Sequence, residues 1–252
     1  MLQQLQQMHL GLVSISHFND SCLKKKLKTN CDLGECLNPN PDKTIMALID
    51  MANIACGGHA GNESSMKKTI NLAIKNNVKI GIHPSYIDKK NFGRVSHNID
   101  EKKLFDDLYK QVKTFQETCL KNNANLEYIK PHGALYHDMM HKKSVLKTIL
   151  KVIKKTNKSL ALVVQAGIKK DEFEKISKKE NIKFLYEVFA DRGYNGLKMI
   201  PRNKPKAVLR DVKLIINQYK KFQKNSETKI DTICFHSDNP ASVKALKKIK
   251  NV

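Results

Sequence analysis

Seven short apolar segments of this chain are each followed, close to their carboxyl end, by a polar residue able to bind a ligand or take part in catalysis. The segments span residues 27–31, 52–56, 78–82, 126–130, 159–164, 182–189 and 232–235. Amphipathic helical patterns separate them, and strands that alternate with helices predict a parallel sheet. The polar residues that follow the segments are Asp32, His59, His83, His132, Gln165, Asp191 and His236.

The number of polar strand ends selects between two parallel architectures. A doubly wound sheet binds its ligand at one or two crevice strands, whereas the strand ends of a closed barrel all surround one pocket. The sequence therefore predicts a seven-stranded (β/α) barrel, folded as a single domain over residues 27–252. Helices are expected over 44–51, 64–76, 99–122, 133–156, 170–179, 207–222 and from 240 onward, with Asn62, Asn98 and Asn239 as N-caps.

The positive charge of the chain does not by itself indicate a nucleic-acid-binding protein. The formal net charge is +22, but only four of the 46 basic residues are arginines, and the lysines are spread over nearly every expected helix. Arginine is the usual residue for bidentate contacts to bases and phosphates, so solvated basic helix faces explain the charge better.

Two further features bear on where the protein works. No apolar run approaches the roughly 18 residues that a membrane span needs, which argues against a membrane protein. The six cysteines include no C-x-x-C pair, and free thiols favour a cytoplasmic location. Residues 1–26 resemble neither a signal peptide nor a βα unit, and we expect them to form a poorly ordered N-terminal extension.

Four of the polar residues have the donor types of a divalent metal site. A carboxylate combined with imidazoles suits Zn²⁺ or a similar ion, and the ligands would be Asp32, His59, His83 and His132. Taken singly, each histidine also fits an ordinary loop residue. Lys130 lies within an apolar segment, where it either meets an anion or a carboxylate or is one more solvated lysine.

Further candidate catalytic residues lie in the loops after the sixth and first segments, and three common catalytic or nucleotide-binding motifs are absent. Asp191 and Arg192 would serve as a general base and an anion clamp, or they form a simple internal ion pair. Glu35 is a second candidate acid. The sequence contains no G-x-x-x-x-G-K-[ST], G-x-G-x-x-G or G-x-S-x-G motif, which disfavours a P-loop nucleotide site and a serine hydrolase.

Six motifs in the same order resemble the LamB/YcsF family, whose members are known as the A-subunit of bacterial 5-oxoprolinase. They are NCDLGE (30–35), ANIACGGHAG (52–61), GIHPSY (81–86) with NFGR (91–94), KPHGALY (130–136), EVFADRGY (187–194) and ICFH (233–236). Three positions depart from the family pattern. Gly58 replaces the usual phenylalanine, Asn62 replaces an aspartate, and Ser237 replaces a glycine.

The resemblance implies a barrel of the glycoside hydrolase/deacetylase group. It also implies ATP-dependent hydrolysis of 5-oxo-L-proline to L-glutamate, with ATP as co-substrate, in a complex with subunits B and C. Asp191 or Asp32 would activate water. The implied catalytic residues are Asp32, Glu35, His59, His83, Lys130, His132 and Asp191, and the implied substrate- or phosphate-binding residues are Asn30, Arg94, Tyr136, Arg192 and His236.

Two alternative functions stay open on the sequence. A stand-alone, divalent-metal-dependent deacetylase or amide hydrolase would share the barrel and the Asp/His residues but would turn over without ATP. A non-enzymatic nucleic-acid-binding protein would need a basic patch rich in arginine, which the scattered lysines do not form.

Overall fold

Seven parallel strands close into a barrel, as the polar strand ends predict. The computed structural model describes residues 27–251, so the expected extension over residues 1–26 lies outside the described residues. The order around the barrel is β1-β2-β3-β4-β5-β6-β9, and β9 closes the sheet by pairing with both β1 and β6. The strands are β1 (Lys28–Leu33), β2 (Met51–Ala55), β3 (Lys79–His83), β4 (Leu126–Ile129), β5 (Ala161–Gln165), β6 (Phe184–Phe189) and β9 (Thr232–Phe235).

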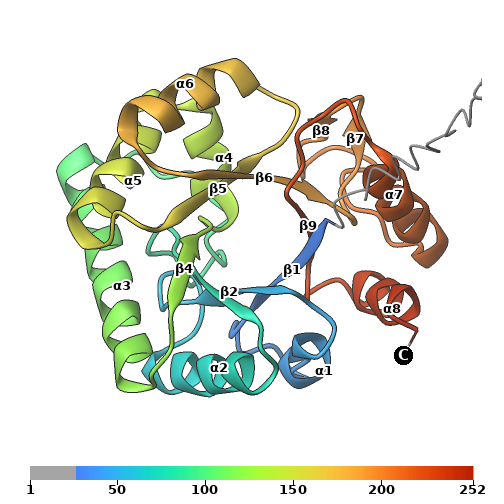
Figure 1. Ribbon diagram of the computed structural model, residues 1–252, viewed down its shortest axis with the longest axis horizontal. Coiled ribbons are helices and arrows are strands. Elements are labelled where there is room, and N and C mark those ends of the chain that lie inside the picture. The colour runs from blue at the N-terminus through green and yellow to red at the C-terminus, as the bar shows by residue number, and fades with distance from the viewer. Residues whose placement is uncertain (1–26, 252) are drawn as a thin grey trace, which may run out of the picture.

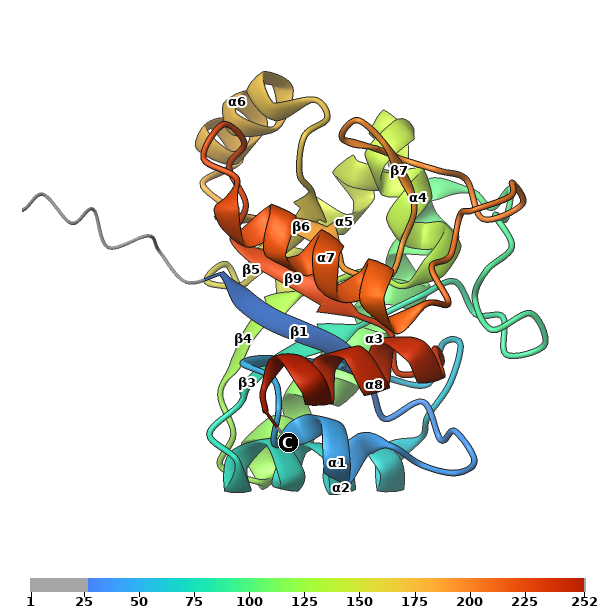
Figure 2. The ribbon, with the colours of Figure 1, turned by 90° about the vertical axis from the view of Figure 1, so that its right-hand side faces the viewer.

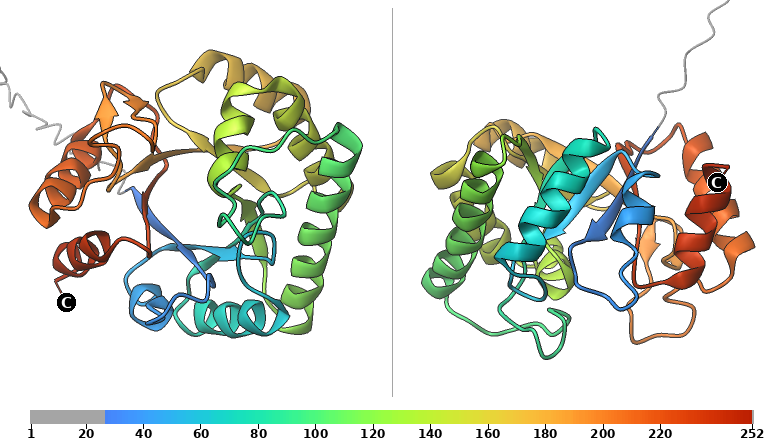
Figure 3. Two further views of the ribbon diagram at one scale, coloured as in Figure 1. Left: turned by 180° about the vertical axis from the view of Figure 1, so that it is seen from behind. Right: turned by 90° about the horizontal axis from the view of Figure 1, so that it is seen from below.

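In the described part of the chain, eight helices surround the strands (Figure 1, Figure 3). None of the helices in residues 27–251 has the length and hydrophobicity that crossing a membrane requires. Asn62 and Asn239 cap their helices as predicted. The helices are α1 (Asp42–Met46), α2 (Glu63–Lys75), α3 (Glu101–Lys121), α4 (Gly133–His141), α5 (Lys143–Thr156), α6 (Lys170–Glu180), α7 (Val212–Lys224) and α8 (Pro240–Ile249).

Successive residues of each strand point alternately out of and into the barrel, which separates an apolar layer from a polar interior. Outward side chains such as Ile54, Val164 and Ile233 are fully buried in the main hydrophobic core beneath the helices. A second, smaller apolar cluster fills one level of the interior and consists of Met51, Tyr128, Ala161 and Val163. The remaining interior positions include buried polar residues that bond to one another, among them Asn30, Asn53, Glu187 and Thr232.

Gly81 makes room for the largest side chain of this interior. A Cβ atom at Gly81 would lie 2.1 Å from the Tyr128 ring. The Tyr128 hydroxyl reaches across the barrel and donates a hydrogen bond to Asn53 Oδ1 at 2.9 Å. The glycine in β3 therefore allows one tyrosine to fill the space between three strands.

The loops after β1, β3 and β6 project from the same end of the barrel (Figure 2). This is the carboxyl end of the strands, where ligands bind in (β/α) barrels. The loop after β6 contains a short antiparallel hairpin, β7 (Tyr194–Asn195) with β8 (Lys198–Met199), which the sequence analysis did not predict.

Several predicted boundaries are wrong. The helix expected over 44–51 ends at Met46, because Met51 begins β2 and pairs with Asn30 and Lys79 in the barrel. The helix expected over 133–156 is divided into α4 and α5 by Lys142, whose backbone is extended.

Two predicted helix starts also shift. Asp100, rather than Asn98, caps α3, since its carboxylate accepts hydrogen bonds from the backbone N–H groups of residues 102 and 103. Helix α7 begins at Val212 rather than at residue 207, because Val208 forms an isolated bridge with Arg192. Three strands run slightly further than predicted, so that Asp32, His83 and Gln165 lie within β1, β3 and β5.

Candidate functional site

The Lys130 ammonium lies at the centre of the barrel with four acceptors around it. Its Nζ lies 3.1 Å from Asp32 Oδ1, 3.0 Å from Glu187 Oε1, 3.2 Å from Asn30 Oδ1 and 3.0 Å from Cys234 Sγ. Lys130 is also the only buried lysine among the described residues. The structure therefore favours the paired-lysine interpretation over the solvated one.

Two amides tie this centre together. Asn30 donates from Nδ2 to Glu187 Oε1 and to Thr232 Oγ1, both at 2.8 Å. Asn53 donates from Nδ2 to Asn30 Oδ1 and to Asp32 Oδ1, both at 2.7 Å. The second oxygen of Glu187, Oε2, is buried without a hydrogen-bond partner. We call the group of Asn30, Asp32, Asn53, Lys130 and Glu187 the interior network.

Burial and the neighbouring charges act in opposite directions on the interior network. Burial alone would lower the pKa of Lys130, but the Asp32 and Glu187 carboxylates outweigh it and raise that pKa well above its usual range. Burial alone would raise the pKa of Asp32, but His83 and Lys130 hold it well below its usual range. For Glu187 burial prevails over Lys130, and the pKa is raised. The site thus keeps an ionised lysine beside an ionised aspartate.

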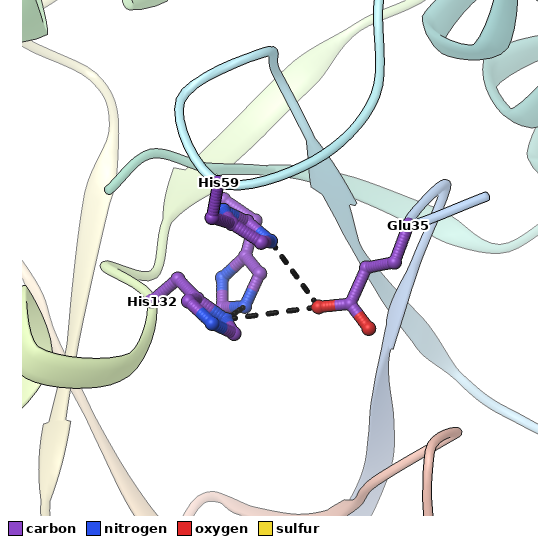
Figure 4. A group of neighbouring side chains, drawn as sticks. Glu35, His59 and His132 are labelled. Carbon is purple, nitrogen blue, oxygen red and sulfur yellow. Dashed lines mark hydrogen bonds and ion pairs between the residues drawn. The ribbon is translucent and has the colours of Figure 1, made fainter. Parts of the chain in front are cut away.

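Above the interior network, Glu35 lies among three buried histidines that we call the Glu–His cluster: Glu35, His59, His83 and His132. His59 Nε2 lies 3.2 Å and His132 Nδ1 3.7 Å from the same oxygen, Glu35 Oε1 (Figure 4). His132 Nδ1 also lies 2.9 Å from His83 Nε2. The rings of His59 and His132 stack with their centroids 3.7 Å apart.

Backbone carbonyls fix the tautomers of two of these histidines. His83 Nδ1 lies 2.6 Å from the carbonyl oxygen of Lys130, and His132 Nε2 lies 3.0 Å from that of Phe92. A carbonyl oxygen can only accept, so each of these nitrogens carries the proton. In the neutral rings the inward nitrogens, His83 Nε2 and His132 Nδ1, are therefore bare acceptors that face each other.

Two glycines, Gly93 in the loop before α3 and Gly133 at the start of α4, allow that loop to pack closely beside His132. Ala134 donates its backbone N–H to the carbonyl of Gly93 at 2.9 Å. Gly133 has a φ of 53°, and a Cβ atom there would lie 2.5 Å from that same carbonyl oxygen. The close approach of the two backbones places the Phe92 carbonyl within reach of the His132 ring.

Burial shifts the pKa values of Glu35, His59 and His132 away from their usual range. Burial, with His83 as the next cause, lowers the pKa of His59 to about 2. Burial and the neighbouring His59 and His83 also lower the pKa of His132 well below its usual range. Burial and the Asp32 carboxylate raise the pKa of Glu35 well above its usual range. Glu35, His59 and His132 thus resist becoming charged.

Asp191 and His236 form a second pair at the barrel mouth. His236 Nδ1 lies 2.7 Å from Asp191 Oδ1, while Asp191 Oδ2 accepts from the backbone N–H of His236 and from Asn239 Nδ2. Burial alone would raise the pKa of Asp191, but His236 outweighs it and lowers that pKa. The Phe189 ring stacks on His236 and also lies 5.3 Å from Lys130 Nζ, so it connects the pair to the interior network.

The other predicted binding residues are less closely grouped. Arg94 pairs with Asp238 at the mouth and lies over the Phe92 ring. Arg192 is buried and donates to the backbone carbonyls of Ala207 and Ile200, so of the two alternatives the internal ion pair with Asp191 is not seen. The Tyr136 hydroxyl is buried without a hydrogen-bond partner, and its ring packs against Phe189.

The residues present fit a divalent metal ion, although the carboxylate differs from the predicted one. The three predicted histidines lie together, but Glu35 lies among them, whereas Asp32 contacts the cluster through His83 at 3.3 Å. Imidazole nitrogens and one carboxylate are ligands that Zn²⁺ and similar ions accept. The buried Nδ1 of His59 has no hydrogen-bond partner, so no outer hydrogen bond fixes the tautomer of this ring.

Sequence reasoning missed Glu187, Asn53 and Tyr128. Glu187 is a charged residue in the apolar strand β6, the same signal that singled out Lys130. Asn53 is an amide within a strand of small and apolar residues. Glu187 and Asn53 form their hydrogen bonds with residues of other strands, and the sequence of a single strand does not reveal those partners.

The three departures from the family pattern have different surroundings. Asn62 caps α2, accepting from the backbone N–H of Ser65 at 3.0 Å. Gly58 has no room for a side chain, since a Cβ atom would lie 2.4 Å from Ser85 Oγ. Ser237 is buried, and its hydroxyl has no hydrogen-bond partner. Asn62 therefore serves as a helix cap.

Comparison with known proteins agrees with this fold and these motifs. Residues 27–252 match the model of the LamB/YcsF family. The chain is 36% identical over 242 residues to the 5-oxoprolinase A-subunit of Vibrio cholerae, covering 90% of this chain and 97% of that protein. The 5-oxoprolinase A-subunit of Pseudomonas fluorescens is 34% identical over 239 residues, covering 89% and 96%.

Solved structures support the fold. The crystal structure of the lactam utilization protein from Thermus thermophilus superposes with a TM-score of 0.77 at 24% identity, covering 88% of this chain and 95% of that chain. A GH113 beta-1,4-mannanase superposes with a TM-score of 0.55 at 7% identity. The barrel is therefore of the type that glycoside hydrolases also use.

Proposed function

This chain belongs to the LamB/YcsF family, and on that premise we propose that it is the A-subunit of an ATP-dependent 5-oxoprolinase. It would hydrolyse the lactam of 5-oxo-L-proline to L-glutamate with cleavage of ATP, together with subunits B and C, in the cytoplasm. The observation that carries the proposal is the near-complete length over which the chain matches relatives named as this component of 5-oxoprolinase. The site supplies groups suited to each step.

The lactam is a stable amide and needs activation before water can attack it. Transfer of the γ-phosphoryl group of ATP to the lactam oxygen would make the ring carbon electrophilic. Water would add to that carbon, the C–N bond would break as the nitrogen takes a proton, and a second water would release phosphate from the acyl phosphate. The products are L-glutamate, ADP and phosphate.

His236 suits the role of the group that takes a proton from the attacking water. Asp191 is fully buried and both of its oxygens already accept hydrogen bonds, so it has little capacity left for water. Its contact to Nδ1 fixes the tautomer of His236 and leaves Nε2 as the acceptor, which is the arrangement of a base held by a carboxylate. Asp191 would thus position the base rather than act alone.

Lys130 and the histidines would stabilise the charge that develops on oxygen. A fixed ammonium in a buried site is an effective electrostatic catalyst, because its environment needs no reorganisation during the reaction. Asp32 and Glu187 keep Lys130 charged and in place. Tyr136, whose buried hydroxyl has no partner, would add a hydrogen bond to the substrate. The Asn30 amide is fully bonded and would instead hold Glu187 and Lys130 in place.

Anion binding would fall to Arg94 at the mouth. It is partly exposed and pairs with Asp238, a partner that a carboxylate or phosphate could replace. Arg192 is held by two backbone carbonyls and would contribute mainly through its charge. The division of ATP binding between this chain and the other subunits belongs to the same proposal.

The test is release of glutamate from 5-oxoproline, with and without ATP, by this chain alone and then with candidate subunits B and C. We expect turnover that requires ATP and all three chains. Asp191→Asn, His236→Gln and His132→Ala should each lower kcat by at least about 100-fold, the scale of losing a positioned acid–base group.

His137→Gln is the matched control, because His137 lies on α4 with an exposed side chain outside the site. It should retain full activity. ATP-independent turnover by this chain alone would contradict the proposal and favour the second candidate, a divalent-metal-dependent amide hydrolase. The Glu–His cluster is the observation that favours this second candidate.

A further inference from the structure

We propose that the Glu–His cluster is a binding site for one divalent transition-metal ion, with Glu35, His59, His83 and His132 as its ligands. The inference rests on the geometry and donor chemistry of these four residues. It is independent of lactam hydrolysis, because metal binding is measured on this chain without substrate.

The spacing of the donor atoms fits a tetrahedral site. With metal–ligand distances near 2.1 Å, neighbouring ligands of a tetrahedral ion lie about 3.4 Å apart. The structure has 2.9 Å between His83 Nε2 and His132 Nδ1, 3.2 Å between His59 Nε2 and Glu35 Oε1, and 3.7 Å between His132 Nδ1 and Glu35 Oε1. These three separations lie on both sides of the ideal value, and all four donor atoms lie within 4.8 Å of one another, so side-chain shifts of about an ångström would close the set around one ion.

The inward atoms are acceptors that lack a donor. The outer nitrogens of His83 and His132 carry the protons, because each donates a hydrogen bond to a backbone carbonyl oxygen. The inward nitrogens of the neutral rings therefore direct their lone pairs at each other across 2.9 Å. Asp32 Oδ2, another acceptor, lies 3.3 Å from the same His83 nitrogen. Only a cation among these atoms, either a metal ion or an added proton, turns the mutual repulsion into attraction.

The surroundings have the outer contacts typical of metal-binding histidines. Ligating imidazoles usually donate their other N–H to a carbonyl or carboxylate, which orients the ring. The Lys130 and Phe92 carbonyls provide such acceptors for His83 and His132. Three imidazoles and one carboxylate favour Zn²⁺, Co²⁺ or another transition metal over Mg²⁺ and Ca²⁺, which prefer oxygen ligands.

The experiment uses the full chain, freed of metal by dialysis against a chelator and then titrated with Co²⁺ and Zn²⁺. Visible d–d absorption of Co²⁺ reports coordination geometry, and calorimetry gives the affinity and stoichiometry for Zn²⁺. We expect one metal per chain and a tetrahedral Co²⁺ spectrum. Added Zn²⁺ should also raise Tm, because a ligand that binds only the folded state stabilises it.

Four variants separate the ligands from their surroundings. Glu35→Gln and His132→Gln should each weaken Zn²⁺ binding by more than the roughly 10–100-fold that loss of an outer contact costs. Asp32→Asn removes a carboxylate that lies beside the ligating nitrogen of His83 but is not one of the four proposed ligands, so its effect should stay within that range. His137→Gln should bind as the wild type does.

Circular dichroism checks that each variant is folded, and the unchanged wild type carries the decisive measurement. Absence of a stoichiometric Co²⁺ or Zn²⁺ complex in the wild type would overturn the proposal and show that the histidines share a proton instead. Equal affinity in Glu35→Gln, His132→Gln and the wild type would overturn the assigned site. Failure of ATP-dependent glutamate release would leave these results unaffected and would count against the proposed function alone.

Discussion

Replacing Lys130 with methionine tests whether the interior network depends on one buried cation. The substitution keeps most of the side chain's volume and removes the ammonium, which has four acceptors within 3.2 Å of Nζ. Asp32 and Glu187 would then lie in the barrel interior without their shared counter-charge. Removing one member of a buried ion pair costs about 3–5 kcal/mol, because the remaining charge is uncompensated.

The expected loss is large enough to measure by urea unfolding and by thermal unfolding, both followed by circular dichroism. In a domain of this size, 1 kcal/mol corresponds to a Tm change of about 2–4 °C, so Lys130→Met should lower Tm by about 6–20 °C. The exposed Lys113 provides the control. Lys113→Met removes only a solvent-screened contact to Glu117 and should change stability by less than about 0.5 kcal/mol.

A double variant distinguishes charge from packing. Glu187→Gln alone should cost about 1–3 kcal/mol, since it weakens hydrogen bonds of a buried carboxylate. Combined with Lys130→Met it removes one of the two uncompensated carboxylates, so the double variant should be more stable than the sum of the single effects by about 1–3 kcal/mol. Effects that simply add, within about 0.5 kcal/mol, would refute the electrostatic reasoning.

The pH dependence of Lys130→Met gives a second check. A buried carboxylate without its cation has a raised pKa, so the folded variant binds a proton more readily than the unfolded chain. Stability then rises as the pH falls, and the deficit relative to wild type should shrink between pH 7 and about 5. A constant deficit over this range would attribute the loss to the altered packing.

Three further outcomes follow from the geometry. Because His236 lowers the pKa of Asp191, the stabilising contribution of Asp191 is complete above its ordinary pKa of about 4 and is lost as the pH falls below it. Asp191→Asn should therefore cost about 1–3 kcal/mol in urea unfolding at pH 7 and progressively less below pH 4; an equal cost at pH 3 would contradict this. Asn62→Ala should lower the free energy of unfolding by about 0.5–2 kcal/mol, whereas Asn62→Asp should leave it equal or raise it by about 0.3–1 kcal/mol, with activity unchanged in both. Gly81→Ala should cost at least about 1–3 kcal/mol in thermal unfolding, since its Cβ would meet the Tyr128 ring, and a neutral effect would show that the ring can move.

The sequence predicted the barrel because each strand is recognisable by itself, as a short apolar segment followed by a polar residue. The strands, their order and the gathering of Asp32, His83 and His132 followed from local pattern plus the geometry of closed parallel sheets. It could not predict that Glu35 would lie among the histidines, because the path of the loop after β1 depends on tertiary contacts. The Asp42 carboxylate, for example, accepts from the backbone N–H of Gly34 at 2.9 Å and shapes that loop.

The helix errors have a similar cause. Residues 133–156 contain a continuous helical pattern, and only the packing of α4 and α5 against different neighbours shows that the chain bends at Lys142. Glu187 was recognisable as a charge in an apolar strand. Its partners Asn30 and Lys130 are separated from it by many residues, so its role required the closed barrel.

The signs of the surface and interior charges suggest how the site would work. The surface lysines give the chain a net charge of +22, a field that attracts anions such as a lactam carboxylate or a nucleotide. The interior instead holds Asp32, Glu35 and Glu187 against Lys130, the one lysine buried in the described part of the chain. Well-packed apolar residues would often be at least as stable as such buried charges, so the arrangement is better explained by function than by stability. Lys130 balances one carboxylate, and a metal ion bound by Glu35 and its histidines would supply further positive charge at the carboxyl end of the barrel.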